Sequence, residues 1–356
     1  MNKKLLVISL FVHDMKAPLA VIGSGAKRLR THMIQSPYGS VGRGLVEKIL
    51  FTKGHASQLL NEILGMDAKA GTGGGLSYGR KKVPFVSSFF SRVKTAFLQK
   101  KVRNSEISLY GLIEELKRVL TDLADTIHAL EIKGKSFDNV RHGKAALRRM
   151  HRNAKIASHL ADNAIAILVN READVTMTVL PINRIVQPAL VEVFDLLNPQ
   201  TSEAIQSADS LAELNHLLLA NELRLNLDAD VWHTAIRCDA DKVKQVLVNL
   251  LLNAFKFRGQ WVRLEVKLLA DRAVFCVIDD GRGISKQDQA YIFKHRFQVK
   301  SAQDFPVRGH GIGLAGAQAL LECIDGHLEL ESEVDKETCF SAILRNIKQD
   351  NAAEQG

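Results

Sequence analysis

The stretch Asn249-Leu-Leu-Leu-Asn253-Ala-Phe-Lys256 decides the fold of the last third of this 356-residue chain. Asn249, Asn253 and Lys256 are spaced i, i+4 and i+7, which places them on one face of a helix. Leucines between them supply a buried face on the other side. An amide oxygen suits a hard cation such as Mg²⁺, which bridges to phosphates, and the lysine adds positive charge. The stretch therefore predicts a helix with one polar, phosphate-facing side.

A second segment, Asp279-Asp280-Gly281-Arg282-Gly283-Ile284, follows a run at 273–278 that predicts a strand. Asp279 therefore lies at a strand end, where its carboxylate can accept a hydrogen bond. Gly281 and Gly283 let the backbone come close to a ligand because neither carries a Cβ atom. Taken alone, the segment is equally typical of a hairpin turn.

The third segment is Gly309-His310-Gly311-Ile312-Gly313-Leu314, and a run at 314–324 that predicts a helix follows it. Backbone N–H groups at the start of a helix bind phosphate oxygens well. The residues between 297 and 309 would form a lid, from which Lys300 and Arg308 can reach phosphates. Three such segments in series are far more specific than one glycine triplet.

In order and spacing, these segments resemble the N, G1 and G2 boxes of sensor histidine kinases, and the Phe-rich stretch 292–297 resembles the F box. The resemblance implies an α/β sandwich ATP-binding domain of the histidine kinase and gyrase type, with ATP and Mg²⁺ as cofactors. It implies that Asp279 recognises adenine and that Asn253 is a Mg²⁺ ligand. The residues that it assigns to the nucleotide site are Asn249, Asn253, Lys256, Asp279, Gly281, Gly283, Ile284, Lys300, Arg308, Gly309, Gly311, Gly313 and Leu314.

The segment His13-Asp14-Met15-Lys16-Ala17-Pro18-Leu19 resembles the phosphoacceptor box of the same family. An imidazole nitrogen can attack a γ-phosphoryl group when a neighbour accepts its other proton. Asp14 fits that general-base and orienting role. By itself the segment is more typical of a surface histidine on an ordinary helix, but the ATP-site segments favour His13 as the phosphoacceptor.

The helix around His13 has a heptad pattern, and His13 lies beside its apolar seam. The seam residues alternate by three and four positions: Leu5, Ile8, Val12, Met15, Leu19, Ile22, Ala26, Leu29 and Met33. Residues 36–39 break the helix, and a second helix is expected from about Leu45 to Met66. The pattern predicts a helical hairpin, which is half of a four-helix bundle, with His13 exposed on its flank.

The chain matches itself when it is shifted by 101 residues, and the match predicts a second hairpin. The seam residues Val12, Met15, Leu19, Ile22 and Leu29 fall on Ile113, Leu116, Leu120, Leu123 and Leu130. Glu114 and Glu115 stand where His13 and Asp14 stand in the first hairpin, and a carboxylate cannot form a phosphoramidate. Two hairpins in one chain predict an internal pseudo-dimer with a degenerate second half. Chance similarity of two amphipathic helices is the alternative.

These features divide the chain into five parts. They are a phosphoacceptor hairpin (1–75), a linker with a connecting helix (76–104), a degenerate hairpin (105–175), an ATP-binding domain (176–350) and a tail (351–356). Within the ATP-binding domain, the stretch 198–211 is rich in Ser, Gln and Ala, which predicts an excursion before a strand at 222–227.

Composition narrows the class of protein further. The net charge is +9, but the basic clusters at 80–103 and 141–155 have little aromatic interleaving, so no nucleic-acid partner is expected. No stretch approaches the roughly 20 apolar residues of a membrane helix. The four cysteines show no CxxC spacing, which favours reduced thiols and a cytoplasmic location.

The resemblance implies ATP-dependent phosphorylation of His13 and transfer of the phosphoryl group to an aspartate of a response regulator in two-component signalling. The internal pseudo-dimer favours a monomer, with a homodimer as the alternative. A regulatory or conformational ATPase of the same ATP fold, without phosphotransfer, is the alternative function. A scaffold that binds a regulator without chemistry is a third.

Overall fold

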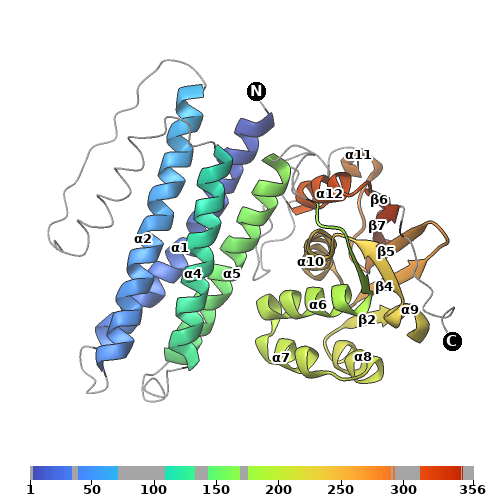
Figure 1. Ribbon diagram of the computed structural model, residues 1–356, viewed down its shortest axis with the longest axis horizontal. Helices are drawn as coiled ribbons and strands as arrows, with labels where there is room; N and C mark the ends of the chain where they lie inside the picture. The colour runs from blue at the N-terminus through green and yellow to red at the C-terminus, as the bar shows by residue number, and fades with distance from the viewer. Residues whose placement is uncertain are drawn as a thin grey trace.

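The computed structural model describes residues 3–33, 39–70, 109–132, 143–168, 175–289, 292, 313–345 and 347. In these ranges the chain forms a group of long helices followed by a part in which helices cover a sheet (Figure 1). The expected linker at 76–104, the tail at 351–356 and four predicted site residues lie outside the described residues. Those four are Lys300, Arg308, Gly309 and Gly311.

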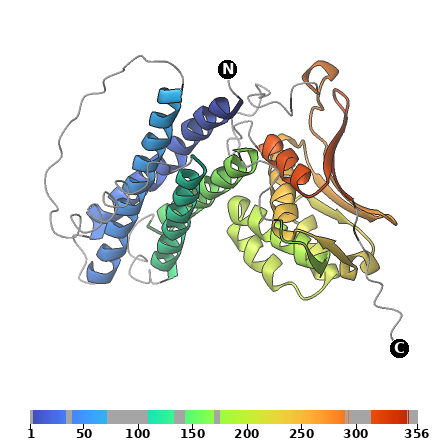
Figure 2. The same cartoon turned by 45° about the horizontal axis from the view of Figure 1, so that its top comes forward.

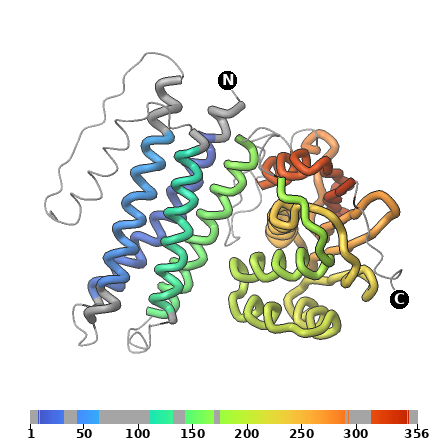
Figure 3. Tube along the Cα trace, in the orientation of Figure 1, coloured from blue at the N-terminus to red at the C-terminus, as the bar shows by residue number. Residues whose placement is uncertain are grey.

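Four long helices of the described ranges make up the first part. They are α1 (Lys3–Met33), α2 (Gly39–Ala70), α4 (Leu109–Ile132) and α5 (Gly143–Leu168). Helix α1 packs against α2 and α5, while α4 packs against α5 and α2, so the four helices close into a ring (Figures 1 and 3). One apolar core runs through all of them. A four-helix bundle is therefore completed within a single chain.

The predicted heptad seam forms part of this core. Its members with described side chains are all buried: Ile8, Val12, Met15, Leu19, Ile22, Ala26 and Leu29. The matching residues of the second hairpin are buried too: Ile113, Leu116, Leu120, Leu123 and Leu130. The seams of the two hairpins thus bury each other, as heptad spacing predicts. None of the helices in the described ranges combines the length and apolar character needed to cross a bilayer.

The second part is an α/β sandwich. In the described residues its main sheet has the strand order β2-β4-β5-β7-β6. The strands are β2 (Leu223–Asn226), β4 (Val262–Leu268), β5 (Arg272–Asp279), β6 (His327–Ser332) and β7 (Thr338–Arg345). Strand β2 runs parallel to β4, and the other pairs are antiparallel. Strands β1 (Thr178–Pro181) and β3 (Ala235–Cys238) form a separate antiparallel pair.

Helices cover one face of the main sheet. Helices α10 (Ala240–Phe257) and α12 (Gly313–Cys323) contact the strands, and α6 (Asn183–Leu197) packs against α10 (Figure 2). The strand residues that face them alternate with outward-facing ones, and Ala273, Phe275 and Val277 of β5 are buried there. The remaining helices are α7 (Pro199–Ser207), α8 (Leu211–Leu219), α9 (Ala229–His233) and α11 (Lys286–Gln289).

Most of the expected excursion at 198–211 is helix α7. Pro199 occupies the first helical turn, where its missing N–H costs nothing. The Ser202 hydroxyl donates to Val191 O at 3.1 Å and contacts Asp195 Oδ1 at 2.5 Å. Contacts of this kind with α6 fix the helix even though its sequence has few apolar residues.

Candidate nucleotide site and phosphoacceptor histidine

Helix α10 presents the polar residues of the first predicted segment. Its leucines on the opposite face are buried: Leu247, Leu250 and Leu251. Asn249 is buried, whereas Asn253 and Lys256 are half-buried. Burial lowers the pKa of Lys256 from its usual value. The helix therefore holds two amides and an amine on one side, as its spacing predicts.

Asp279 ends strand β5 in a buried position. Its Oδ1 accepts a hydrogen bond from the backbone N–H of Gly281 at 3.0 Å. Burial raises the pKa of Asp279 to about 7, and the nearby charge of Asp280 adds to the effect. A poorly solvated carboxylate of this kind gains from any further hydrogen-bond donor. Asp279 therefore fits the recognition of an amine.

The adjacent carboxylate, Asp280, is occupied by backbone hydrogen bonds. It accepts backbone hydrogen bonds from Gly259, Gln260 and Trp261 at 2.9–3.0 Å. Partial burial acts in the opposite direction, but these bonds lower the pKa of Asp280. Asp280 therefore stays ionised and fixes the loop between α10 and β4, while Asp279 remains available to a ligand.

Gly283 needs to be a glycine for two reasons. Its φ of +68° is left-handed, and an added Cβ atom would collide with the backbone carbonyl of Glu333. The next residue, Ile284, donates its N–H to Ser332 Oγ at 2.9 Å. Asp335, in the turn between β6 and β7, has a φ of +59° and so takes a conformation that usually favours glycine. The second segment thus packs directly on this turn.

The start of the third segment's helix lies against the first segment. An added Cβ atom on Gly313 would be 3.1 Å from Asn249 Oδ1 and 3.9 Å from Asn253 Nδ2. Leu314 packs against the apolar core of the sandwich. The structure therefore brings the beginning of α12 together with both asparagines, although these lie about 60 residues earlier in the chain.

Two residues of the bundle reach this site, and the sequence analysis did not identify them. Asn163 Nδ2 donates to Asn249 Oδ1 at 3.0 Å, and Asn249 Nδ2 donates to Asn163 Oδ1 at 2.7 Å. His159 Nε2 also lies 2.9 Å from Asn249 Oδ1. The available signal was a polar residue at a core position, because Asn163 falls among the buried Leu160 and Ala164.

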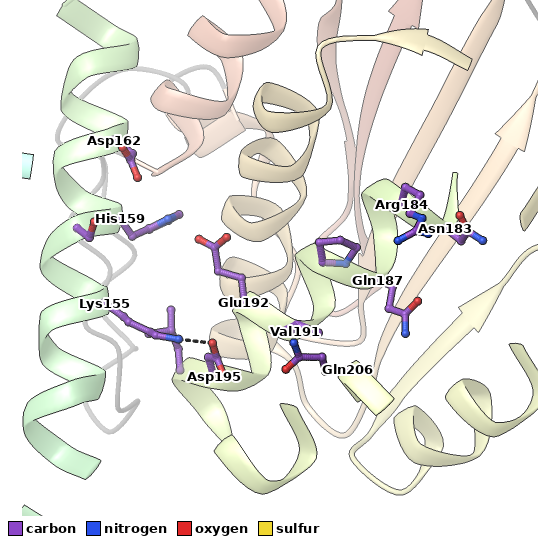
Figure 4. Close-up of a pocket in the computed structure, with 13 residues that line it drawn as sticks. Lys155, His159, Asp162, Asn183, Arg184, Gln187, Val191, Glu192, Asp195 and Gln206 are labelled. Carbon is purple, nitrogen blue, oxygen red and sulfur yellow. Dashed lines mark hydrogen bonds and ion pairs between the residues drawn. The ribbon is translucent and has the colours of Figure 1, made fainter. Parts of the chain in front are cut away.

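A cleft of about 580 Å³ separates the same helix, α5, from α6 (Figure 4). Polar and charged residues of both helices line it, and Lys155 of α5 forms an ion pair with Asp195 of α6. None of the described residues of the three nucleotide segments lines it. This part of the contact between the sandwich and the bundle therefore includes an ion pair between charged side chains.

His13 lies on α1 with 78% of its side chain exposed. Its Nδ1 is 3.1 Å from Asp14 Oδ1, and the Asp14 side chain is only 2% exposed. A carboxylate only accepts hydrogen bonds, so the proton of the neutral ring lies on Nδ1 and the lone pair on Nε2. The more reactive nitrogen thus belongs to an exposed ring that a buried carboxylate orients.

Comparisons with known proteins match part of this chain to a family of ATPases. Residues 238–347 match the family described as "Histidine kinase-, DNA gyrase B-, and HSP90-like ATPase". The chain is 35% identical over 147 residues to the circadian input-output histidine kinase CikA of Synechococcus elongatus, a match covering 41% of this chain and 19% of that protein. It is 30% identical over 150 residues to the adaptive-response sensory kinase SasA of Parasynechococcus marenigrum, covering 41% and 39%.

A solved structure, the histidine kinase AdeS of Acinetobacter baumannii, aligns with 15% identity and a TM-score of 0.39 over 64% of this chain and 96% of that one. The matched region spans less than two fifths of the two curated relatives. The chain therefore contains a histidine kinase-like ATPase domain, and its relatives at about 30% identity are sensory histidine kinases.

Proposed function

We propose that this chain is an ATP-dependent protein histidine kinase. It phosphorylates His13 and passes the phosphoryl group to an aspartate of a response regulator in two-component signalling. The observation that carries the proposal is the exposed His13, oriented by the buried Asp14, on a bundle against which a histidine kinase-like ATPase domain packs.

In the proposed reaction, His13 Nε2 attacks the γ-phosphorus of ATP while the bond to the β-phosphate oxygen breaks and ADP leaves. The imidazole gains positive charge as the new N–P bond forms. Asp14 stabilises that charge and accepts the Nδ1 proton, because its carboxylate already lies 3.1 Å away. A hydrogen bond of this kind also fixes the ring orientation for attack.

We propose the following roles for the nucleotide-site residues. Asp279 accepts the adenine amine, and Gly281, Gly283 and Ile284 form the wall beside the base. Asn253 is the protein ligand of Mg²⁺, which neutralises phosphate charge when bound. The phosphates are supported by the remaining residues: Asn249, Lys256, Lys300, Arg308, Gly309, Gly311, Gly313 and Leu314. The buried acceptor at Asp279 and the cluster of amides against the start of α12 fit this assignment.

A charge-swapped pair supports the proposal that the two hairpins arose by duplication. Arg30 of α1 pairs with Glu47 of α2 at 3.7 Å. Moved by 101 residues, these positions are Glu131 of α4 and Arg148 of α5, which pair at 3.6 Å. The same contact at matching positions, with its charges reversed, favours common origin over chance similarity.

This arrangement supports His13 as the histidine on which the ATPase domain acts. The domain follows α5, whose own hairpin has Glu114 at the acceptor position. It must therefore act on His13 of the other hairpin, and α1 packs directly beside α5. The reaction is then the single-chain counterpart of transfer between two hairpins of a dimer.

The test is incubation with γ-labelled ATP and Mg²⁺. We expect an acid-labile label on the wild-type chain, no label on His13→Ala, and unchanged label on Glu114→Ala. Acid-labile label that persists in His13→Ala would assign the acceptor elsewhere. Phosphate release without any protein label would instead favour the alternative, a conformational ATPase.

A further inference from the structure

Three metal-binding side chains meet near the end of α4 and the start of α5. His128 and Glu131 are one turn apart on α4, and His151 faces them from α5. One ligand atom from each residue lies within 4.8 Å of the others. The two imidazole rings have centroids 5.3 Å apart and are tilted by 37°. The kinase chemistry proposed above uses none of these residues.

The surroundings suit a metal ion with an open coordination position. His128 is exposed, while Glu131 and His151 are half-buried. His128 and Glu131 also lie in the last two turns of α4, where the unpaired carbonyls of a helix favour positive charge.

We propose that His128, Glu131 and His151 bind a divalent transition metal ion of the Zn²⁺ class and clamp α4 to α5. Two imidazoles and one carboxylate form a donor set that Zn²⁺ uses when water occupies the fourth position. Tetrahedral coordination places ligand atoms about 3.3 Å apart, so the exposed His128 side chain must move inward to close the site.

The Arg148 guanidinium would compete with a metal ion for the Glu131 carboxylate. Arg148 Nε lies 3.6 Å from Glu131 Oε1, whereas His151 Nδ1 lies 3.6 Å from Oε2, so the guanidinium charge opposes a cation bound to the same carboxylate. The first hairpin lacks these ligands, because the positions 101 residues earlier are Lys27, Arg30 and Leu50. The metal clamp therefore belongs to the second hairpin alone.

That hairpin is also the one that contacts the ATPase domain. His151, Lys155, His159 and Asn163 follow one another at intervals of four along one ridge of α5. Lys155 pairs with Asp195 of α6, and the last two contact Asn249 of α10. A metal at His151 would hold the helix on which the domain docks.

The test uses the full chain, freed of metal with a chelator and without nucleotide. Calorimetric titration with ZnCl₂ should show one site, and Co²⁺ should give the visible absorption of a tetrahedral complex without a thiolate band. Single variants His128→Ala, Glu131→Gln and His151→Ala should each weaken Zn²⁺ binding by about 10-fold or more. The matched control is His327→Ala, which removes a surface histidine that is paired with Glu329 at 3.0 Å.

Arg148→Ala should tighten Zn²⁺ binding, because it removes the cation that competes for Glu131. A rise in Tm with Zn²⁺ should occur in the wild-type chain and disappear in His151→Ala, while excess Mg²⁺ should not displace Zn²⁺. Unchanged affinity in the three ligand variants, a thiolate band with Co²⁺, or no gain from Arg148→Ala would each overturn the proposed site.

Discussion

Asn163 of the bundle and Asn249 of the ATPase domain exchange two hydrogen bonds, at 3.0 and 2.7 Å, and both side chains are buried. Asn249 Oδ1 also lies 2.9 Å from His159 Nε2. While these bonds persist, Asn249 Oδ1 has two partners and Nδ2 uses one of its two N–H groups, so one N–H donor is left for a further ligand. With the phosphate-binding role proposed above for Asn249, docking limits this residue to that single donor and should weaken nucleotide binding.

Asn163→Ala should accordingly tighten MgATP binding. A buried amide left without its partner costs about 1–3 kcal/mol, so docking should weaken by about 5- to 150-fold. We expect the Kd for MgATP, measured with a fluorescent analogue, to fall several-fold. The matched control is Glu62→Ala, 101 residues earlier on α2. Unchanged or weaker binding in Asn163→Ala would mean that Asn249 contributes to the nucleotide site while docked.

Asp14→Asn should slow phosphorylation of His13 without changing ATP affinity. The substitution keeps the shape of the side chain but removes the charge that stabilises the ring during attack. General acid–base catalysis is typically worth 10²- to 10⁴-fold, so we expect the initial labelling rate to fall by about 100-fold or more. Glu115→Gln, at the corresponding position of the second hairpin, should label normally. A wild-type rate in Asp14→Asn would remove Asp14 from the mechanism.

Asp279 should make ATP binding depend on pH. Adenine's amine needs the ionised carboxylate, and burial raises the pKa of Asp279 to about 7. Below that pH, the Kd for ATP should rise by about tenfold per pH unit, and Asp279→Asn should bind weakly at every pH. Isothermal titration across about pH 6 to 8 measures both effects. Strong ATP binding by Asp279→Asn would show that the Asp279 carboxylate does not recognise adenine.

The raised pKa of Asp279 should also affect the stability of the chain when no nucleotide is bound. Its pKa is 3.8 before burial and about 7 in the folded chain, so the native state binds the proton more tightly. Stability from this group is present below pH 3.8 and is lost as the pH rises through 7. Asp279→Asn should therefore raise the Tm at pH 8 relative to the wild type. A lower Tm would contradict the burial argument.

Periodic patterns made much of this fold predictable. The seam from Ile8 to Leu29 and the strand at 273–278 were readable because spacing in sequence reports directly which side chains face the core. The reversed charges of the pairs Arg30–Glu47 and Glu131–Arg148 could not be interpreted from the sequence. They became informative only when the structure showed that the two residues of each pair are in contact.

The contact between bundle and ATPase domain could not be predicted in this way. Asn163 and Asn249 are 86 residues apart and belong to the bundle and the ATPase domain, respectively. Helix and strand periodicity reports only on residues of one element, so it could not predict that these two meet. The cluster at His128, Glu131 and His151 is similar, because it depends on how α4 packs on α5. Such sites come from tertiary packing, and a sequence signals them only as polar residues among apolar ones.

The chain should act as a monomer that phosphorylates itself. Seam residues of α1 and α4 share one core with α2 and α5, so the bundle is complete without a second chain. The large apolar residues exposed in the described ranges, such as Val179 and Leu219, all lie outside the bundle helices. A stripe that would drive dimerisation is therefore absent from the described bundle surface. Light scattering should give the mass of one chain, 39.4 kDa.

The rate of labelling and the mixing of two inactive variants test whether phosphorylation of His13 occurs within one chain. Transfer within one chain makes the labelled fraction per unit time independent of protein concentration, whereas transfer between chains makes it rise with concentration. Mixing His13→Ala, which keeps its ATP site, with Asn253→Ala, which keeps its acceptor, should give no label. In a dimer that exchanges subunits, the first chain would phosphorylate His13 of the second. Label in that mixture, or a mass of two chains, would show that the internal bundle does not replace a dimer.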